Sequence, residues 1–560
     1  MVQYLRQATE DPFFRQQETL DALESLSAAD ELVIYCGAGV SIDRTGVTWS
    51  QLIDDVFTQA RATRHDKEAE FDSVRYLIDN LENTKQSASI MMGAFMAPGT
   101  TENQFLTPKL HDIIYKESGW SRGYMLRNLI QLSITTASVG RNVLIITTNY
   151  DSYIESEFTA QYGRLVANGV PVAALPGIRR RVLGGPRVKH VTVRKHGTAT
   201  GLIEIVYLHG RVDLDNGPTE GVLVLSEGSY ASTQEQSQKV LIDSFRGRSK
   251  GVLVIGASLT DEPLINALAL TKGDAGERYA LIAVPPPVFS PRTKAILPST
   301  ISTKTVSEAL RLRGAHLGIG VLNPMSHYQS PQFLEELRIA GSAAVKTSNS
   351  EYYRDNTNSI NYAQRLKSWH ELWAARANTK DPEFAYQILH DGLESGIKNV
   401  LKVSAPEGEM FRAEVWVREN PRSANRTLTL WANSTGPIRD RQILRREPIQ
   451  RDSSNASVVA FTDGRPRLLS IRKLGLPVEA SRWQTFFSTP IFISADIAIG
   501  TDPDNAYIPV GVITLASNLP ITDDAGKKKS VFASLIVSQF EDLKAQLIGM
   551  GRTILRATDV

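Results

Sequence analysis

The chain has 560 residues, a formal net charge of +2 at pH 7 and a single cysteine. Its length indicates two to four domains, and its small net charge implies no strong field for nucleic acid or for a membrane surface. One cysteine excludes an intramolecular disulfide and fits a cytoplasmic protein. The N-terminus has no apolar signal core, and no apolar run approaches the ~18 residues that a membrane helix needs.

The first predicted strand ends in glycines. A helix is expected over 14–29, and the apolar run Leu32–Cys36 then leads into Gly37-Ala38-Gly39-Val40-Ser41. Glycines between a strand and a helix let backbone N–H groups approach a nucleotide phosphate, to which the Ser41 hydroxyl would also donate. The same pattern suits any tight turn between a strand and a helix, so this motif alone leaves both interpretations open.

Three later apolar strands also end in polar or small residues. They run into Thr148-Asn149-Tyr150-Asp151, His209-Gly210 and Gly256-Ala257-Ser258-Leu259. Asp261 then begins a predicted helix that has Pro263 in its first turn. Because ligands bind beyond the carboxyl ends of strands in open parallel sheets, these segments are predicted to share one ligand-binding edge.

The remaining pattern up to residue 335 alternates strands with helices. A helix is expected over Trp49–Ala60, mostly helical structure over 62–135, and further strands at 279–284 and 319–322. This alternation predicts a doubly wound parallel α/β sheet. Residues 171–201 are basic and irregular, which indicates a solvated loop or β-ribbon, with phosphate recognition or an inter-subunit contact as the alternatives.

In this order, the four strand-end motifs resemble the SIR2 (sirtuin-like) fold over roughly residues 20–330. In particular they resemble the SIR2-like domains of bacterial antiphage-defence proteins, in which an asparagine and a histidine are the catalytic pair. The resemblance implies a Rossmann-like, NAD-binding domain at 1–335 whose helical insertion, at about 62–135, covers the nucleotide.

The chain departs from the protein deacetylases of that family in two ways. Their zinc module needs two Cys-x-x-Cys pairs, whereas this chain has only Cys36. Their Pro-Asp-Phe-Arg segment is also missing between Ser41 and Trp49. Both departures weigh against an acyl-lysine substrate. No metal is expected, because His190, His196 and His316 have no partners at ligand spacing.

The resemblance makes Asn149 and His209 the expected catalytic pair. Cleavage of nicotinamide from NAD passes through an oxocarbenium-like transition state, so the site must position the ribose and exclude water. The histidine can accept a proton, and the asparagine can hold the ribose or a water molecule. The alternatives are a core histidine, a turn asparagine, and helix caps at Asp151 and Asp261. The expected cofactor-binding residues are Gly37, Ala38, Gly39, Ser41, Thr148, Asp151, Gly256, Ser258 and Asp261.

A second unit is predicted after a helical connector at 336–380. Residues 381–560 begin with a helix and continue as strands, including 411–417, 427–432, 489–494 and 509–517. An amphipathic helix at about 530–550 ends the unit. The Pro490-Ile491 and Gly511–Ser517 segments resemble a GAF domain, which implies an α+β sensor and dimerisation module with an antiparallel sheet.

The leading functional hypothesis is an NAD glycohydrolase that stays silent until a signal reaches the GAF-like unit, as an effector of antiphage defence. The signal would be a small molecule or an activating protein partner, and a homo-oligomer is expected. The alternatives are an ADP-ribosyl cyclase or transferase, a non-catalytic NAD or ADP-ribose sensor, and an NAD-dependent deacylase. Neither a membrane nor nucleic acid is indicated as a partner.

Overall fold

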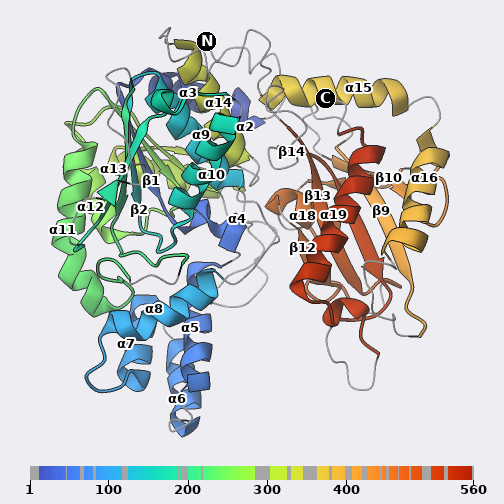
Figure 1. Cartoon of the computed structure of the whole chain (residues 1–560), viewed down its shortest axis with the longest axis horizontal. Helices are drawn as coiled ribbons and strands as arrows, with labels where there is room; N and C mark the ends of the chain where they lie inside the picture. The colour runs from blue at the N-terminus through green and yellow to red at the C-terminus, as the bar shows by residue number, and fades with distance from the viewer. Residues whose placement is uncertain are drawn as a thin grey trace.

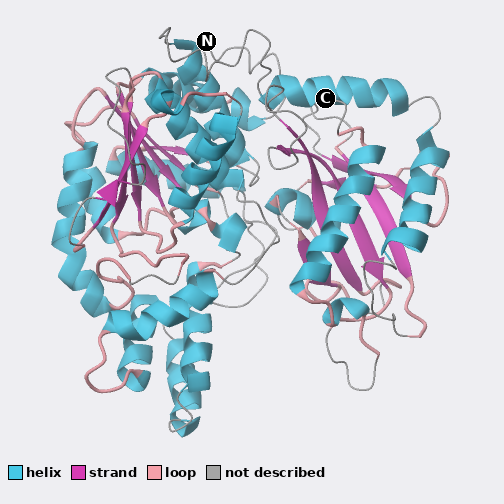
Figure 2. Cartoon of the chain, viewed as in Figure 1, coloured by secondary structure: helices cyan, strands magenta, loops and turns pink. Residues whose placement is uncertain are grey.

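The structure of the protein is a computed structural model with two separate β-sheets (Figures 1 and 2). It describes residues 12–557 except for 46, 64–67, 80–83, 116–123, 168, 186–188, 191–199, 216–218, 284–302, 325–328, 345–361, 378–380, 398–406, 419–426, 441–443, 450–452, 465, 478–480, 495–505 and 522–527.

The first sheet has the strand order β4-β3-β5-β2-β1-β6-β7-β8, and only β4 is antiparallel to its neighbour. The four strands that end in the predicted motifs are β5, β2, β1 and β6. They lie next to one another in the centre of the sheet. The strands are β1 (Glu31–Cys36), β2 (Asn142–Thr147), β3 (Gly177–Val182), β4 (Lys189–His190), β5 (Leu202–Tyr207), β6 (Lys250–Ile255), β7 (Arg278–Leu281) and β8 (Gly320–Leu322).

The register brings the carboxyl ends of the central strands level. Cys36, the last residue of β1, pairs with Thr147 at the end of β2 and with Ile255 at the end of β6. Thr147 in turn pairs with Tyr207 at the end of β5. The four predicted strand-end segments therefore start from one edge of the sheet, as the parallel arrangement requires.

Helices cover both faces of this sheet. Alternate residues of β1 enter two different cores: Leu32 and Ile34 pack with α3, α9, α10 and α14, whereas Val33 packs with α11 and α12. This arrangement confirms the predicted doubly wound α/β sheet. The helices are α2 (Pro12–Arg15), α3 (Gln17–Ala28), α9 (Tyr124–Ser138), α10 (Tyr153–Ala167), α11 (Glu227–Phe245), α12 (Glu262–Leu270), α13 (Thr303–Leu317) and α14 (Gln329–Ala344).

Four helices between β1 and α9 project from one end of the sheet (Figure 1). The rings of Phe57, Phe71 and Phe95 meet in their core, with centroids 4.2 to 5.7 Å apart. The predicted insertion over 62–135 includes most of α9. In the structure α9 does not belong to this projecting group, because it packs against β2, β5 and α14. The four helices are α5 (Trp49–Thr63), α6 (Glu68–Asp79), α7 (Thr84–Phe95) and α8 (Glu102–Ile114).

The basic segment around residue 180 is a strand of the sheet, which corrects the prediction of a solvated loop, whereas its antiparallel pairing with the short β4 agrees with the predicted β-ribbon. β3 pairs in parallel with β5, and only the short β4 folds back on it. Within β3, Arg179 donates to Glu204 and Arg180 is buried among carboxylates. These ion pairs explain why a strand of the sheet carries three arginines in a row. Residues 191–199 lie outside the described residues.

The second sheet is antiparallel, with the order β11-β10-β9-β14-β13-β12. Pro490-Ile491 lies within β13, and Pro490 pairs with Val512 of β14. The strands are β9 (Phe411–Val417), β10 (Thr427–Asn433), β11 (Arg446–Pro448), β12 (Arg467–Ser470), β13 (Thr485–Ser494) and β14 (Ala506–Ser517). The predicted antiparallel α+β architecture is therefore confirmed.

One face of this sheet is covered by α15 (Tyr362–Ala377), α16 (Asp381–Asp391) and α19 (Val537–Ile554), and the other by α18 (Ala456–Asp463). Trp369 of the predicted connector donates its indole N–H to the Leu555 carbonyl at 2.9 Å. The helix α15 therefore packs with the second sheet.

The last helix differs from its prediction. It starts at Val537, after a short 3₁₀ turn at Val531–Ala533, and not near residue 530. Its apolar side chains Leu543 and Leu547 are fully buried against the chain's own sheet. This face is therefore not available to pair with a second copy.

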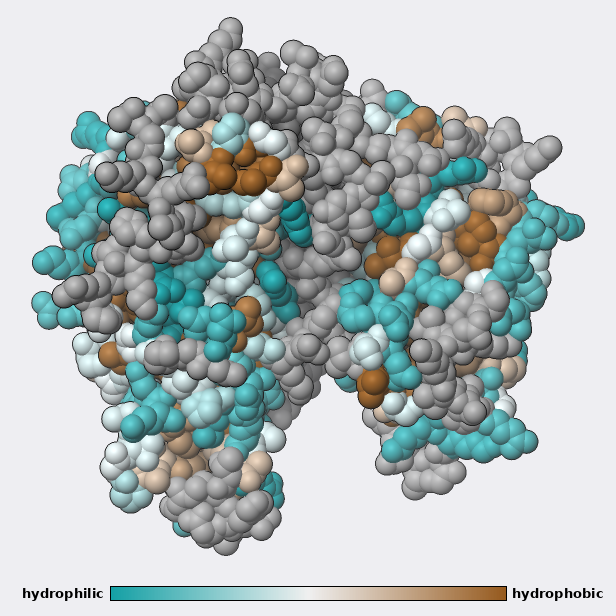
Figure 3. All heavy atoms as spheres, in the orientation of Figure 1, coloured by the Kyte–Doolittle hydropathy of each residue, from teal (hydrophilic) through white to brown (hydrophobic). Residues whose placement is uncertain are grey.

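On the face shown in Figure 3, the described residues are mostly hydrophilic or pale, with separate hydrophobic patches between them. Among the residues that the structure describes, no helix is long and apolar enough to cross a membrane.

We expect Leu547→Ala to destabilise the second unit by about 2–5 kcal/mol, because the truncation leaves a cavity under α19. Asp542→Ala, at an exposed position of the same helix, is the control and should stay within about 0.5 kcal/mol. Urea unfolding followed by tryptophan fluorescence measures both. A change in oligomeric state without loss of stability would show instead that this face joins two copies.

Candidate functional site

Two glycine turns meet above the ends of β1 and β6. A Cβ atom on Gly37 would lie 2.5 Å from the carbonyl oxygen of Gly256, and one on Gly39 would lie 2.7 Å from the Gly256 Cα. Gly256 itself has a φ of +65°, a region that favours glycine. All three glycines are therefore required for the close packing of one turn on the other, a reason that the sequence prediction did not include.

The backbone N–H groups of the first turn are largely occupied. Gly37 donates to Ile255 and Gly39 to Gly256, both at 2.9 Å, while Val40 and Ser41 donate to carbonyls inside the turn at 3.1 and 3.2 Å. The N–H of Ala38 is not among these donors. A phosphate could therefore meet the turn at Ala38, but a full ring of free N–H groups is not present in this conformation.

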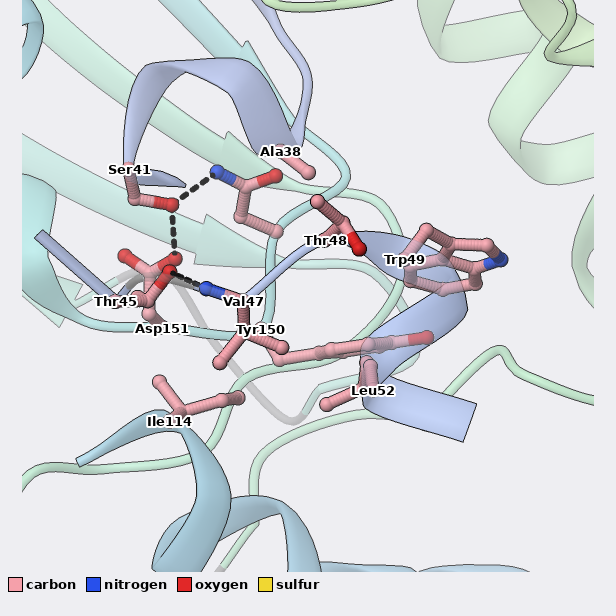
Figure 4. Close-up of a pocket in the computed structure, with 11 residues that line it drawn as sticks. Ala38, Ser41, Thr45, Val47, Thr48, Trp49, Leu52, Ile114, Tyr150 and Asp151 are labelled. Carbon is pink, nitrogen blue, oxygen red and sulfur yellow. Dashed lines mark hydrogen bonds between the residues drawn. The ribbon is translucent and has the colours of Figure 1, made fainter. Parts of the chain in front are cut away.

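Asn149, Ser41 and Asp151 form a buried chain of hydrogen bonds. The Asn149 Nδ2 donates to Ser41 Oγ at 3.0 Å, and Ser41 Oγ donates to Asp151 Oδ2 at 2.8 Å. Figure 4 shows the Ser41 and Asp151 side chains pointing toward one another at one side of a cavity. Ser41 therefore donates its single hydroxyl proton to Asp151 and orients Asn149. The sequence prediction had assigned this donation to a phosphate.

Asp151 serves the following helix as well. Its Oδ1 accepts the N–H of Tyr153, the first residue of α10, at 3.2 Å. Burial raises the pKa of Asp151, whereas the bonds from Ser41 and Tyr153 and the nearby Arg44 oppose this rise. Asp151 therefore caps the following helix, as the sequence-based alternative has it, and also orients Asn149 through Ser41.

The cavity beside this chain has a volume of about 40 Å³. Its other side carries Trp49 and Tyr150, whose stacked rings have centroids 5.8 Å apart (Figure 4). Among the described residues, the Asn149 Oδ1 accepts no hydrogen bond, so it can serve a ligand. The lining residues are Ala38, Ser41, Thr45, Val47, Thr48, Trp49, Leu52, Ile114, Asn149, Tyr150 and Asp151.

His209 follows β5 at the same edge of the sheet but does not line this cavity. Its side chain is 3% exposed, and its ring meets the ring of Tyr230 edge-on at 5.2 Å. Burial, and secondarily the charge of Lys85, lowers the pKa of His209 to about 3. The imidazole is therefore neutral at physiological pH, and among the described residues it makes no hydrogen bond.

Of the remaining predicted binding residues, Ser258 and Asp261 follow β6, and Thr148 follows β2. Asp261 occupies the N-cap position of α12 and accepts the Tyr35 hydroxyl at 3.0 Å, and burial raises its pKa. Thr148 donates its N–H to Cys36 across the neighbouring strand ends at 3.2 Å. Ser258 is exposed, and its hydroxyl lies 2.7 Å from that of Thr260.

A buried ionic cluster, which the sequence did not reveal, holds the segment after His209. Arg211 donates to Glu155 and to Asp213, each at 2.9 Å. Arg180 of β3 joins Glu155 at 2.9 Å and Glu220 at 2.8 Å. These bonds connect β3, α10 and the loop after β5. Except for Arg211 and Asp213, which are two residues apart, the partners lie 25 to 56 residues apart, too far for a spacing rule to detect.

Within the part of the chain that the structure describes, no group of three or more His, Cys, Asp or Glu side chains could hold a metal ion. His190 lies in β4 and His316 in α13, whereas His196 falls outside the described residues.

We expect Gly39→Ala to lower the free energy of unfolding of the first unit by more than about 1 kcal/mol, because its Cβ would meet backbone atoms that cannot yield. Gly93→Ala is the matched control: it lies inside α7 with open space around it and should stabilise by up to about 1 kcal/mol. Thermal unfolding measures both. Equal stability of Gly39→Ala and the parent protein would contradict the packing argument.

The family model of the SIR2-like domain matches residues 143–302. The match starts in β2 and includes Asn149, His209 and Gly256, but not the turn at 37–41. No curated protein matches the chain. Residues 143–302 are therefore similar to a SIR2-like domain, and since such domains use NAD, this similarity suggests an NAD-related activity.

Proposed function

We propose that this protein cleaves NAD⁺ into nicotinamide and ADP-ribose. The observation that carries the proposal is the buried chain from Asn149 through Ser41 to Asp151, at the sheet edge that His209 shares. Such a chain fixes the orientation of one amide and leaves its oxygen toward a cavity, which is the arrangement of a binding site and not of a simple turn.

The chemistry needs a site that tolerates positive charge at the anomeric carbon. Asn149 Oδ1 can accept a hydrogen bond from a ribose hydroxyl or from the attacking water molecule, while Asp151 holds the Ser41 hydroxyl that orients the amide. His209 is the proposed acceptor of a proton from a ribose hydroxyl or from water, a role that requires its pKa, which burial lowers to about 3, to rise when the substrate binds.

The aromatic pair Trp49 and Tyr150 limits the access of water to Asn149. The cavity of about 40 Å³ is much smaller than the roughly 300 Å³ or more of a typical ligand pocket. A dinucleotide would therefore place only its reacting end there, or the lining segment Thr45–Leu52 would move outward. This segment leads directly into the insertion helices, so their movement would control access.

We expect purified protein incubated with NAD⁺ to release free nicotinamide and ADP-ribose, measured by liquid chromatography. Asn149→Ala and His209→Ala should each reduce the rate at least about 100-fold without unfolding the protein. His316→Ala, at an exposed position of α13, is the control and should leave the rate unchanged.

Either variant keeping near-parent turnover while folded would remove that residue from the catalytic pair. Cyclic ADP-ribose, or ADP-ribose attached to an acceptor, in place of free ADP-ribose would identify a cyclase or a transferase at the same site. Binding of NAD⁺ without any cleavage would identify a sensor, and NAD-dependent removal of acyl groups from lysine would identify a deacylase.

We also propose that the second unit controls this activity, since an NADase that was always active would deplete its own cell. Residues 381–560 are interpreted as a GAF-like sensor for a small molecule or a protein partner, in a homo-oligomeric effector of bacterial antiphage defence. The support is the six-stranded antiparallel sheet with helices on both faces. Coupling requires that the signal bind the active state more tightly than the silent one.

Truncation after residue 344 should separate NAD⁺ cleavage from its trigger and leave the sheet unit either permanently silent or permanently active. This boundary also removes α15, because deletion of 381–560 alone would expose Trp369, which is buried against Leu555. Candidate cyclic nucleotides added to the full chain and to the truncated chain provide the assay. A truncated protein that still responds to the same nucleotide would place the sensor in the first unit.

A further inference from the structure

Tyr150 stands between two polar residues that follow β2, but its side chain takes a different direction from theirs. Its neighbours Asn149 and Asp151 both form hydrogen bonds with Ser41. The Tyr150 side chain extends away from Ser41 and Asp151 (Figure 4). It is 3% exposed, and its hydroxyl donates to the Val224 carbonyl at 2.6 Å. The hydroxyl proton is therefore committed to the loop that follows β5.

The main chain of Tyr150 holds the same loop at a second point. Its carbonyl accepts the N–H of Val212 at 2.8 Å. Val212 lies three residues after His209, and Val224 donates its own N–H to the His209 carbonyl at 3.2 Å. Tyr150 therefore bonds to the loop shortly after the chain leaves His209 and again where the chain returns to it.

The two ends of this loop pack closely on each other. Gly210 has a φ of +79°, and a Cβ atom on it would lie 2.6 Å from the Val222 carbonyl oxygen. Arg211 and Glu220 exchange two backbone hydrogen bonds, at 2.9 and 3.0 Å. Because the two ends are joined in this way, a shift of the Val224 end would also move the end that carries His209.

The fold of the loop does not depend on the Tyr150 hydroxyl alone. Tyr115, the C-cap of α8, donates its hydroxyl to the Val212 carbonyl at 2.8 Å. Asn103 of α8 accepts the N–H of Leu223 at 3.0 Å. Loss of the Tyr150 hydroxyl should therefore leave the loop folded, while it removes one of the bonds that join the loop to the segment after β2.

We propose that Tyr150 is a positioning residue that fixes His209 relative to Asn149: its hydroxyl and its carbonyl hold the loop after β5 against the segment after β2. Two side chains that act on one substrate must both lie within about 0.5 Å of the productive geometry. The inference rests on the proposed function for its catalytic meaning, but the link between the two segments is independent of any substrate. It gives Tyr150 a role in addition to its stacking on Trp49.

The test removes one oxygen atom from the full chain. Tyr150→Phe keeps the ring but loses the bond to Val224. We expect kcat for NAD⁺ cleavage to fall about 10-fold and KM to stay within about threefold, because the contacts with the substrate remain. Hydrogen–deuterium exchange of the peptide 221–226 should become faster. Tyr162→Phe is the matched control and should leave kcat unchanged, since the Tyr162 hydroxyl donates to the Pro176 carbonyl at 2.7 Å and does not line the cavity.

An unchanged kcat in folded Tyr150→Phe overturns the inference. An equal loss in Tyr162→Phe overturns it as well, because the effect would then reflect stability in general. A lower kcat with unchanged exchange at 221–226 would show that the hydroxyl does not act through the loop, which also contradicts the proposal. If exchange becomes faster but the parent protein cleaves no NAD⁺, the proposed function fails while the link between the two segments stands.

Discussion

The close contact between the two glycine turns is the constraint on which the rest of the site depends. Gly37 and Gly39 pass within van der Waals limits of Gly256 only because none of the three carries a Cβ atom. The contact joins the ends of β1 and β6, and the chain after it delivers Ser41 to the end of β2. The position of the polar side chains therefore depends on how closely the two backbones pack at this contact.

The first unit contains two buried polar groups near the site: the hydrogen-bond chain of Asn149 and the ionic cluster of Arg211. The chain from Asn149 to Asp151 borders the cavity and leaves one amide oxygen for a ligand. The cluster around Arg211 lies behind the segment that follows His209 and connects it to β3 and α10. Loss of one partner would leave an uncompensated buried charge, so breaking these ion pairs is costly.

The second unit has a different organisation, because its antiparallel sheet has separate apolar contacts on its two faces. Its last helix is packed on that sheet, and α15 is joined to it through Trp369 and Leu555. The apolar face of α19 is buried on this sheet, so the second unit cannot self-associate through it.

The central strands of the first sheet could be predicted from the sequence, because apolar runs that end in glycine or polar residues are local signals. The same local pattern placed Asn149 and His209 at strand ends. Sequence did not reveal Arg180 as part of a strand, since a run of arginines is normally solvated and its carboxylate partners lie elsewhere in the chain. It also misjudged the end of the insertion, because helical periodicity does not tell which surface a helix covers.

The sequence by itself determined the parallel sheet, the antiparallel second unit and the residue types at the strand ends, all of which follow from short-range patterns. Only the tertiary structure decided how these residues are used. It committed the Ser41 proton to Asp151, made the glycines a packing requirement and brought Lys85 of a distant helix to Tyr230 beside His209. The physical reason is that hydrogen bonds, close approach and charge act between atoms near in space, whatever their separation along the chain.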